Sequence, residues 1–275
     1  MENTKIQWTD ATINFWSGCK KVSDGCKFCY MYRDKERYGL NGSDVIQVSE
    51  KTISKTLRSL NKPSKIFTCS WSDFFIDEAD QWREAAWNVI RKYPQHQWQI
   101  LTKRPERIKD CLPPDWGTGW KNVWLGVSIE NNANKHRLLT LHNLKKACST
   151  FLTFVSFEPA LGELNLLRDE LTRTEFRRLD WMIIGGESGN ATGKYRYRPC
   201  KMEWITGMIE QCKEAEVKVF VKQLGTAMAK ERKLYDWHGG DVDEWDNSIQ
   251  VREFPAYNVA VSNGTEKGKG GPALF

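Results

Sequence analysis

Short apolar runs alternate with amphipathic segments over most of the chain. Seven apolar runs end in polar or glycine-rich turns and are predicted to be strands: Ile13–Trp16, Ile66–Ser70, Trp98–Thr102, Val123–Ser128, Phe151–Phe157, Trp181–Ile184 and Val217–Val221. Apolar residues at three- and four-residue intervals predict helices between them, over Ser49–Leu60, Asp77–Lys92, Asn131–Lys146, Leu167–Arg178 and Met202–Glu214. This alternation predicts a parallel sheet with helical crossovers.

The succession of strand–helix units is not interrupted by a linker rich in proline, glycine or serine. We therefore expect an α/β fold in which residues 1–230 form a partial or complete (β/α) barrel. A doubly wound open sheet is the alternative. The alternation stops after Gly225, so residues 231–275 are predicted to form an irregular acidic C-terminal extension over the barrel mouth, with a flexible tail from Ser262.

Composition excludes several classes of protein. The 275 residues are 40% hydrophobic and 28% charged, which is not typical of disordered, collagen-like or coiled-coil chains. The net charge of +6 is compatible with a polyanionic partner but does not establish one. The start of the chain lacks a signal-peptide pattern, and no apolar stretch reaches the roughly 18 residues of a membrane span. We expect a cytoplasmic protein with reduced thiols and no membrane association.

Three of the eight cysteines form a cluster. Cys19, Cys26 and Cys29 have the spacing C-x6-C-x2-C and directly follow the first predicted strand. Three thiolates on one loop can hold either zinc or an iron–sulfur cluster. Structural zinc usually takes a fourth nearby Cys or His ligand, which the sequence does not offer, whereas three cysteines suit a [4Fe–4S] cluster with one open iron. Of the scattered cysteines, Cys69 stays ambiguous and the other four are expected to pack in the interior.

Polar side chains follow almost every predicted strand. Because the carboxyl ends of parallel strands meet at one edge, they predict a mouth that is filled by a ligand. These residues are Ser70, Ser72, Asp73, Lys103, Arg104, Ser128, Glu130, Glu158, Gly185, Gly186, Glu187, Lys222 and Gln223. For any one of them, a solvated loop position or a helix cap is an equally good interpretation.

The cysteine loop resembles that of the radical S-adenosylmethionine (radical SAM) superfamily. The three cysteines end in C-x-F-C and precede parallel strand–helix units, although the first interval is six residues where the superfamily commonly has three. Five further motifs are similar to a family of phage-encoded radical-SAM-like proteins. They are Ile6–Thr12, Asn14–Cys19, Val22–Tyr30, Gly185–Gly189 and Phe220–Gly225. Some members of that family are linked to hypermodified thymidine in phage DNA, including isomerisation of an amino-acid adduct on the base.

The resemblance implies roles for the polar residues at the strand ends. Phe28 would lie near adenine, Ser70, Ser72 and Asp73 near the methionine moiety, Ser128, Glu130 and Glu158 near the ribose or carboxylate, and Gly185 and Gly186 near adenine or substrate. For Gly185–Gly189, a tight turn capped by Glu187 is the alternative. Glu158, Glu187, Lys222 and Gln223 would steer the substrate radical. Glu187 and Lys222 together would bind a zwitterionic amino-acid substituent.

A basic and aromatic run occurs at residues 194–199. Interleaved cations and rings can grip phosphates and stack bases, as single-stranded nucleic-acid sites do. The predicted nucleic-acid-binding residues are Lys194, Arg196, Tyr197 and Arg198, with Lys103 and Arg104 on another loop of the same face. The alternative is a solvated edge segment whose tyrosines pack.

Together these patterns predict a radical SAM enzyme that uses a [4Fe–4S] cluster and S-adenosyl-L-methionine to generate a 5′-deoxyadenosyl radical. The expected reaction isomerises an amino-acid-modified thymidine in phage DNA, in the cytoplasm of the infected bacterial host. A one-electron reductant of the flavodoxin or ferredoxin type would be its partner. Two alternatives remain open: a zinc-stabilised nucleic-acid-binding protein, and a radical SAM enzyme that acts on a peptide.

Overall fold

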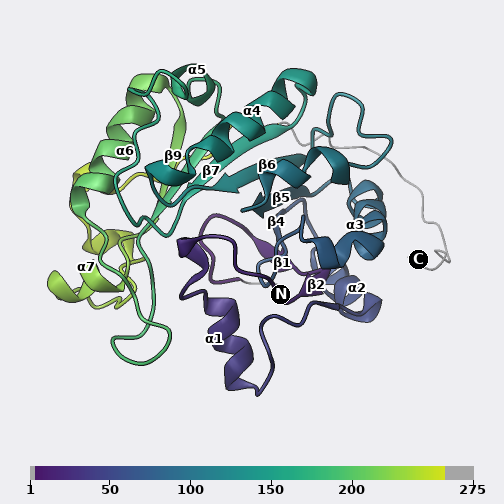
Figure 1. Cartoon of the computed structure of the whole chain (residues 1–275), viewed down its shortest axis with the longest axis horizontal. Helices are drawn as coiled ribbons and strands as arrows, with labels where there is room; N and C mark the ends of the chain where they lie inside the picture. Colours follow the sequence, from purple (N-terminus) through teal and green to yellow (C-terminus); the bar gives the residue numbers. More distant parts are fainter. Residues whose placement is uncertain (1–3, 258–275) are drawn as a thin grey trace.

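A computed structural model of the chain describes residues 4–257. Seven parallel strands form one curled sheet, in which their order is the same as along the chain (Figure 1). The strands are β1 (Ala11–Ile13), β4 (Lys65–Thr68), β5 (Gln97–Thr102), β6 (Val123–Ser128), β7 (Leu152–Phe157), β8 (Trp181–Gly185) and β9 (Lys218–Gln223). Because the order never reverses, the sheet is a half barrel with β1 and β9 as its edges, not a doubly wound sheet. The predicted partial barrel is confirmed.

The first predicted strand is divided in two. Its start belongs to β1, and its end begins β2 (Trp16–Ser17), which pairs with the antiparallel strand β3 (Ile46–Gln47). The loop that carries the three cysteines follows β2 and, with α1, connects it to β3. Only Ile13 of the predicted strand lies in β1, so the sequence pattern missed the turn of the chain away from the sheet.

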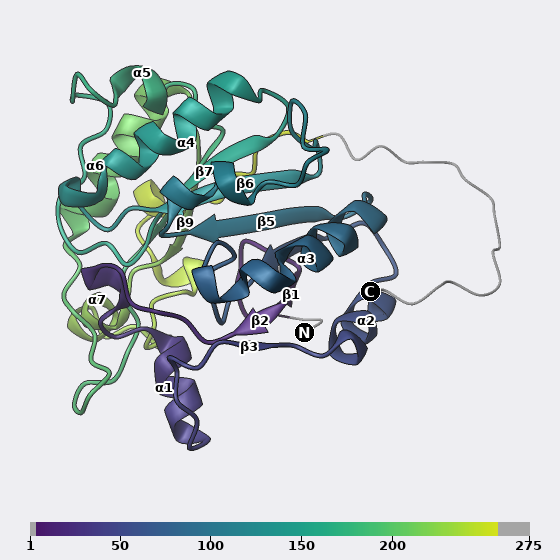
Figure 2. The same cartoon turned by 45° about the vertical axis from the view of Figure 1, so that its right-hand side comes forward.

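Four predicted helices are confirmed. They are α2 (Glu50–Ser59), α3 (Asp80–Lys92), α4 (His136–Ala147) and α6 (Met202–Ala215). Two short helices were not predicted: α1 (Tyr30–Arg37), which follows the cysteine loop, and α7 (Thr226–Glu231). Figures 1 and 2 show α4, α5 and α6 together on one face of the sheet, whereas α1 projects from the opposite side.

The helix predicted over Leu167–Arg178 is wrong for most of its length, because only α5 (Arg173–Phe176) forms. The Gln211 side chain accepts hydrogen bonds from the backbone N–H groups of Leu166 and Leu167. The Thr172 hydroxyl donates to the carbonyl of Leu166. The side chains of Gln211 and Thr172 thus hold the start of this segment in a non-helical conformation.

Alternate residues of the strands build two separate cores. One face packs against the helices, and the other carries an aromatic cluster on the concave side. The cluster consists of Trp8, Phe67, Trp124, Phe154, Trp181, Ile183 and Phe220. Gly126 makes room for it, because a Cβ at this position would stand 2.4 Å from Cζ of Phe154. The concave face is thus filled by rings and becomes polar only toward the carboxyl ends of the strands.

The chain after β9 returns along that edge strand. Arg252 forms an antiparallel bridge with Phe220, and Trp245 and Ile249 are buried in the main core. The predicted boundary at residue 230 falls within α7. The described part of the extension therefore packs mainly on β9, and the predicted tail from Ser262 lies outside the described residues.

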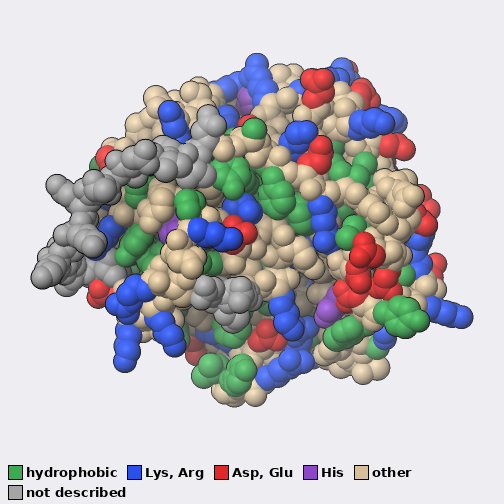
Figure 3. Space-filling view, turned by 180° about the vertical axis from the view of Figure 1, so that it is seen from behind, with side chains coloured by type: hydrophobic (Ala, Val, Ile, Leu, Met, Phe, Trp, Pro, Cys, Tyr) green, Lys and Arg blue, Asp and Glu red, His purple; other side chains and the backbone are tan. Residues whose placement is uncertain are grey.

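Charged side chains are mixed on the face shown in Figure 3, where lysine and arginine alternate with acidic residues instead of forming one continuous basic patch. Between residues 4 and 257, no helix has the length and apolarity that a bilayer span requires.

Candidate functional site

A cavity of about 380 Å³ opens at the carboxyl ends of the strands. Its floor is the aromatic cluster of the concave face, with Trp8, Phe67 and Leu101 exposed to it. One wall is the cysteine loop and the other is made of strand ends. The predicted site residues that line it are Cys19, Cys26, Phe28, Cys29, Ser70, Ser72, Asp73, Lys103, Arg104, Ser128, Glu158, Glu187 and Lys222. The fold thus brings together residues that are far apart in the sequence.

All three cysteines of the loop are free and half-buried. Gly18 precedes Cys19 with φ +104°, and a Cβ there would stand 2.0 Å from the carbonyl oxygen of Asp44, so only glycine fits. The Ser72 hydroxyl donates to the carbonyl of Gly18. Contacts from the segment before β3 and from the loop after β4 therefore determine where Cys19 lies.

Glu130 supports the loop from below. It is fully buried, forms a 2.9 Å ion pair with Arg137 and accepts a 2.7 Å hydrogen bond from the Ser23 hydroxyl. Gly25 packs directly on its carboxylate. The sequence interpretation of Glu130 as a cofactor ligand is corrected, because its side chain lies beneath the cysteine loop and is not part of the cavity wall.

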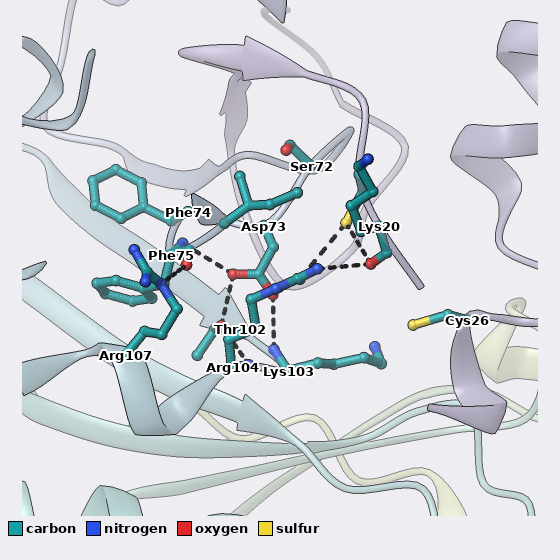
Figure 4. A network of polar contacts seen from close by, with 12 residues as sticks. Lys20, Cys26, Ser72, Asp73, Phe74, Phe75, Thr102, Lys103, Arg104 and Arg107 are labelled. Carbon is teal, nitrogen blue, oxygen red and sulfur yellow. Dashed lines mark hydrogen bonds and ion pairs between the residues drawn. The ribbon is translucent and has the colours of Figure 1, made fainter. Parts of the chain in front are cut away.

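Asp73 joins the ends of β4 and β5 (Figure 4). Its Oδ1 accepts hydrogen bonds from the Thr102 hydroxyl at 2.7 Å and from Phe75 N at 3.0 Å. Its Oδ2 accepts from Lys103 N at 2.9 Å and lies 3.2 Å from Nη1 of Arg104. Because these contacts occupy the carboxylate, Asp73 organises the cavity wall and does not present a free acceptor to a ligand.

Two cations at the end of β5 face the thiols. Nη1 of Arg104 lies 3.8 Å from Sγ of Cys19, and Nη2 donates to the carbonyl of Lys20 at 2.8 Å. The side chain of Lys103 extends toward Cys26 (Figure 4). These residues were predicted to lie at the mouth and to bind nucleic acid. The structure places both in the cavity wall, with Arg104 against Cys19.

The cysteines and Lys103 affect one another electrostatically. Burial raises the pKa of the Cys19 thiol to about 12, with Asp73 adding to the effect and Arg104 opposing it. Burial also raises the pKa of Cys29. For Lys103, burial lowers the pKa, but Glu130 and the thiols of Cys26 and Cys29 outweigh it, so the pKa is raised overall. A metal that binds here would release protons from the thiols.

The three cysteines are donors of the kind that iron–sulfur clusters take. Within residues 4–257, no group of three or more His, Cys, Asp or Glu side chains is arranged so that it could hold a metal ion. The thiolates that hold a cluster bind different irons and need not converge on one point. Cys19, Cys26 and Cys29 share one cavity wall opposite Lys103 and Arg104, which would offset the negative charge of such a cluster.

Glu158 and Lys222 form an ion pair inside the cavity. Oε1 of Glu158 lies 2.5 Å from Nζ of Lys222, and each side chain is only 19% exposed. Gly185 lies beside them, since a Cβ at that position would approach Cδ of Glu158 to 3.1 Å. Glu187 and Lys222 were predicted to bind a zwitterionic substituent together, whereas the carboxylate beside Lys222 is that of Glu158.

Glu187 is instead paired with Arg198. Oε1 lies 2.5 Å from Nη2 of Arg198, and Oε2 accepts 2.8 Å hydrogen bonds from Nε and from the backbone N–H of the same residue. Nη1 of Arg198 also donates to the carbonyl of Asp24 at 3.0 Å, and its guanidinium lies 5.1 Å from the ring centroid of Phe28. Arg198, predicted as a nucleic-acid contact, thus ties the β8 loop to the cysteine loop.

The rest of the basic and aromatic run lies outside the cavity. Lys194 forms a 2.9 Å ion pair with Glu36 of α1, and Tyr195 is buried. Tyr197 has Nζ of Lys230 5.3 Å from its ring centroid, and Arg196 is exposed. Lys194, Arg196 and Tyr197 therefore remain the surface candidates for contacts with nucleic acid.

The glycine tract after β8 allows its backbone to pack closely against the backbone at Leu224. A Cβ on Gly186 would stand 2.1 Å from the carbonyl oxygen of Leu224. The Gln223 side chain donates to the carbonyl of Gly186 at 2.9 Å. Gly185, Gly186 and Gln223 do not line the cavity, so the geometry favours the tight-turn interpretation over contact with a cofactor.

Sequence reasoning missed a histidine at the cavity edge. His238 lines the cavity, and its Nδ1 lies 3.3 Å from the Thr226 hydroxyl. Burial lowers its pKa. It is the contribution of the C-terminal extension to the cavity wall, and no periodicity or motif marks it in the sequence. Cys69 also lines the cavity, but its thiol accepts hydrogen bonds from the backbone of Phe15 and Trp16.

Fold and site define an α/β protein with an open parallel half barrel and a cysteine-lined cavity at its carboxyl edge. The model of one protein family, described as a protein of unknown function (DUF5131), matches residues 3–265. The chain belongs to this family. No curated protein and no solved structure matches it.

Proposed function

We propose that the protein is a radical SAM enzyme that holds a [4Fe–4S] cluster on Cys19, Cys26 and Cys29. The observation that supports this most directly is the position of these three free thiols, which share one cavity wall opposite Lys103 and Arg104. In (β/α) barrels, chemistry is concentrated at the carboxyl ends of the strands, which is where this cavity lies.

When bound, such a cluster and S-adenosyl-L-methionine supply the one-electron reduction that yields a 5′-deoxyadenosyl radical. The chain provides orientation and a dry environment. Trp8 and Phe67 close the cavity from below, and Ser70, Ser72 and Ser128 offer hydroxyl groups along its wall. Phe28 provides an apolar surface beside the cysteines.

The Glu158–Lys222 pair supports an amino-acid substituent as the reacting group. Holding two opposite charges in a partly desolvated cavity costs free energy that an exposed pair does not. A zwitterionic amino-acid group offers each member a counter-charge: its ammonium group would pair with Glu158 and its carboxylate with Lys222. We propose that the substrate is an amino-acid-modified thymidine, which the enzyme isomerises.

DNA is the proposed carrier of that base. An enzyme that acts on a base must receive it from a single strand or rotate it out of the duplex. Lys194 and Arg196 are exposed cations, and Tyr197 offers a ring beside them. They would hold the flanking phosphates and bases.

Anaerobic reconstitution with iron and sulfide tests the proposal. The expected protein is brown, contains about four irons per chain, loses its visible absorbance with dithionite and converts S-adenosyl-L-methionine to 5′-deoxyadenosine. Cys26→Ala should lose the colour. Cys148→Ala is the matched control, because Cys148 is also free and half-buried but does not line the cavity.

Modified DNA then tests the substrate. Digestion to nucleosides should show a product with unchanged mass and altered chromatographic retention. A colourless protein that binds stoichiometric zinc would contradict the cluster and support a zinc-stabilised nucleic-acid-binding protein. Turnover of a peptide but not of modified DNA would contradict the substrate alone.

A further inference from the structure

We propose that the outer face of the cysteine loop is the docking surface for a small acidic protein that carries one electron at a time. We define this outer face as Lys20, Lys21, Val22 and Lys27. The inference rests on the proposed function, because only a redox cluster behind the loop would require such a donor.

The loop has two sides with different character. Cys19, Cys26 and Cys29 line the cavity. The four residues of the outer face are exposed to solvent, and Val22 is 46% exposed. Lys20 follows Cys19 directly and Lys27 follows Cys26, and consecutive Cα atoms are about 3.8 Å apart. A protein seated on these lysines would therefore be separated from the thiols by little more than the thickness of one chain.

Two other directions toward the thiols are closed in the described part of the chain. The aromatic floor with Trp8 and Phe67 closes the cavity from below. The buried Glu130–Arg137 pair lies beneath the loop. The open mouth would be occupied by cofactor and substrate during turnover. The outer face remains as the approach that a donor can use without displacing them.

Three exposed lysines outnumber the one exposed carboxylate of the same loop, Asp24, so the charge of the outer face favours an acidic partner. Lys21 donates to the backbone carbonyl of Lys27, and its Nζ lies 4.7 Å from the ring centroid of Tyr32. Nζ of Lys27 lies 5.4 Å from the ring centroid of Phe28. These neutral groups hold the two lysines in place without cancelling their charges. Lys20 has an exposed 3.4 Å ion pair with Glu78, which a partner carboxylate could replace.

The composition of the outer face favours a protein over a nucleic acid. An exposed aliphatic side chain, Val22, lies among the lysines, and an apolar contact within a charged rim is typical of protein–protein interfaces. Complementary charges mainly increase the rate and specificity of association. This suits a donor that must bind, transfer an electron and leave.

The test compares the double variant K21E/K27E with the parent protein, with reduced flavodoxin as the probe. The affinity for flavodoxin is measured on the metal-free protein, and electron transfer is followed on the reconstituted protein by its visible absorbance. We expect affinity and transfer rate to fall about tenfold and to lose their salt dependence. Reduction by dithionite should still go to completion. The neutral variant K21Q/K27Q should give an intermediate loss.

The matched control is K51E/K55E, which reverses two exposed lysines of α2 at a distance from the cysteine loop (Figure 2). It should behave as the parent. Unchanged flavodoxin affinity in K21E/K27E would overturn the inference, as would a loss of DNA binding with an unaffected donor. If the parent forms no cluster, the proposed function fails, while flavodoxin binding to the metal-free protein still decides whether the outer face is a docking surface.

Discussion

The backbone of Gly25 rests on the carboxylate of Glu130, so closely that a Cβ on residue 25 would stand 2.3 Å from Oε1 of Glu130. Glu130 is held in turn by Arg137 at the start of α4. The cysteine loop is therefore seated on a buried ion pair at the end of β6. Its shape depends on a contact with a residue that contributes nothing to the chemistry directly.

Gly25→Ala should disturb the contact between the cysteine loop and Glu130. The added methyl group would force the loop away from Glu130, at a cost of about 1–3 kcal/mol in the free energy of unfolding. We also expect iron retention after reconstitution to fall several-fold. The control is Gly207→Ala in α6, where a Cβ meets nothing within 4 Å and should stabilise the helix by roughly 0.5–1 kcal/mol. Equal iron content in Gly25→Ala and the parent would show that the contact does not position the cysteines.

The Glu187–Arg198 pair should couple two loops. Arg198→Ala leaves the buried carboxylate of Glu187 without its partner and frees the carbonyl of Asp24. We expect a loss of about 2–4 kcal/mol in stability, measured by urea denaturation. Glu187→Ala combined with Arg198→Ala should lose less than the sum of the single variants, with a coupling of about 1–3 kcal/mol. Additive losses would mean that the pair does not act as one unit.

The aromatic cluster depends on the missing side chain at position 126. Gly126→Ala would place a Cβ against the ring of Phe154 and should destabilise the fold by about 1–3 kcal/mol. Phe154→Leu in the same chain should recover part of that loss, because it removes the ring that is struck. Thermal unfolding of the parent and the two variants measures this, and a double variant less stable than Gly126→Ala would contradict it.

The cavity ion pair should matter for turnover and not for cluster assembly. Glu158→Gln and Lys222→Met should each retain the iron content of the parent but lower turnover of modified DNA by about a hundredfold. Because the two residues act on one substrate group, the double variant should be hardly worse than either single one. Lys218→Met with Glu253→Gln is the matched control, since Lys218 is on β9, as Lys222 is, and this pair is exposed. A similar loss in the control would indicate a general effect on β9.

Buried histidines should weaken the fold in acid. His96 is buried, and its Nδ1 accepts a 3.2 Å hydrogen bond from Ser64 N, which requires the neutral ring. Burial lowers the pKa of His96 and also of His142. Above the unfolded-state pKa of about 6.5, both states are neutral at these residues and nothing is lost. As the pH falls below it, the unfolded chain binds protons first.

Each such histidine therefore lowers stability by about 1.4 kcal/mol per pH unit until its folded form also titrates. His96→Gln should reduce the slope of unfolding free energy between pH 6.5 and about 5. His136→Gln, at an exposed position, is the control and should leave the slope unchanged. An identical slope in His96→Gln and the parent would contradict the assignment.

The sequence pattern predicted the strands well because each buried strand is a local apolar run. Four helices followed from periodicity in the same way. The helix predicted over Leu167–Arg178 forms only at Arg173–Phe176. At its predicted start, the side chain of Gln211, 45 and 44 positions away, instead holds the backbone N–H groups of Leu166 and Leu167. A contact between residues so far apart in the sequence cannot be predicted from the local pattern of apolar and polar residues.

For the candidate site, too, the sequence predicted local features but not long-range contacts. The spacing of Cys19, Cys26 and Cys29 identified one wall of the cavity, and the polar strand ends identified most of the other. The sequence could not assign partners. Arg104 faces Cys19 and not the solvent, Lys222 pairs with Glu158, and Arg198 with Glu187. The sequence shows the charge and type of each side chain, but it does not show toward which neighbour the side chain points.

The sequence by itself determined the alternation of strands and helices and the one loop that carries three thiols, because both depend on residues close together in the chain. The strand order in the structure decided between a half barrel and a doubly wound sheet. Only the tertiary structure decided what holds that loop. Ser23 meets Glu130 across 107 positions, and Arg198 meets the carbonyl of Asp24 across 174. These contacts exist because successive crossovers bring the carboxyl ends of β6 and β8 to the same edge as the end of β1, and that path is a property of the whole sheet.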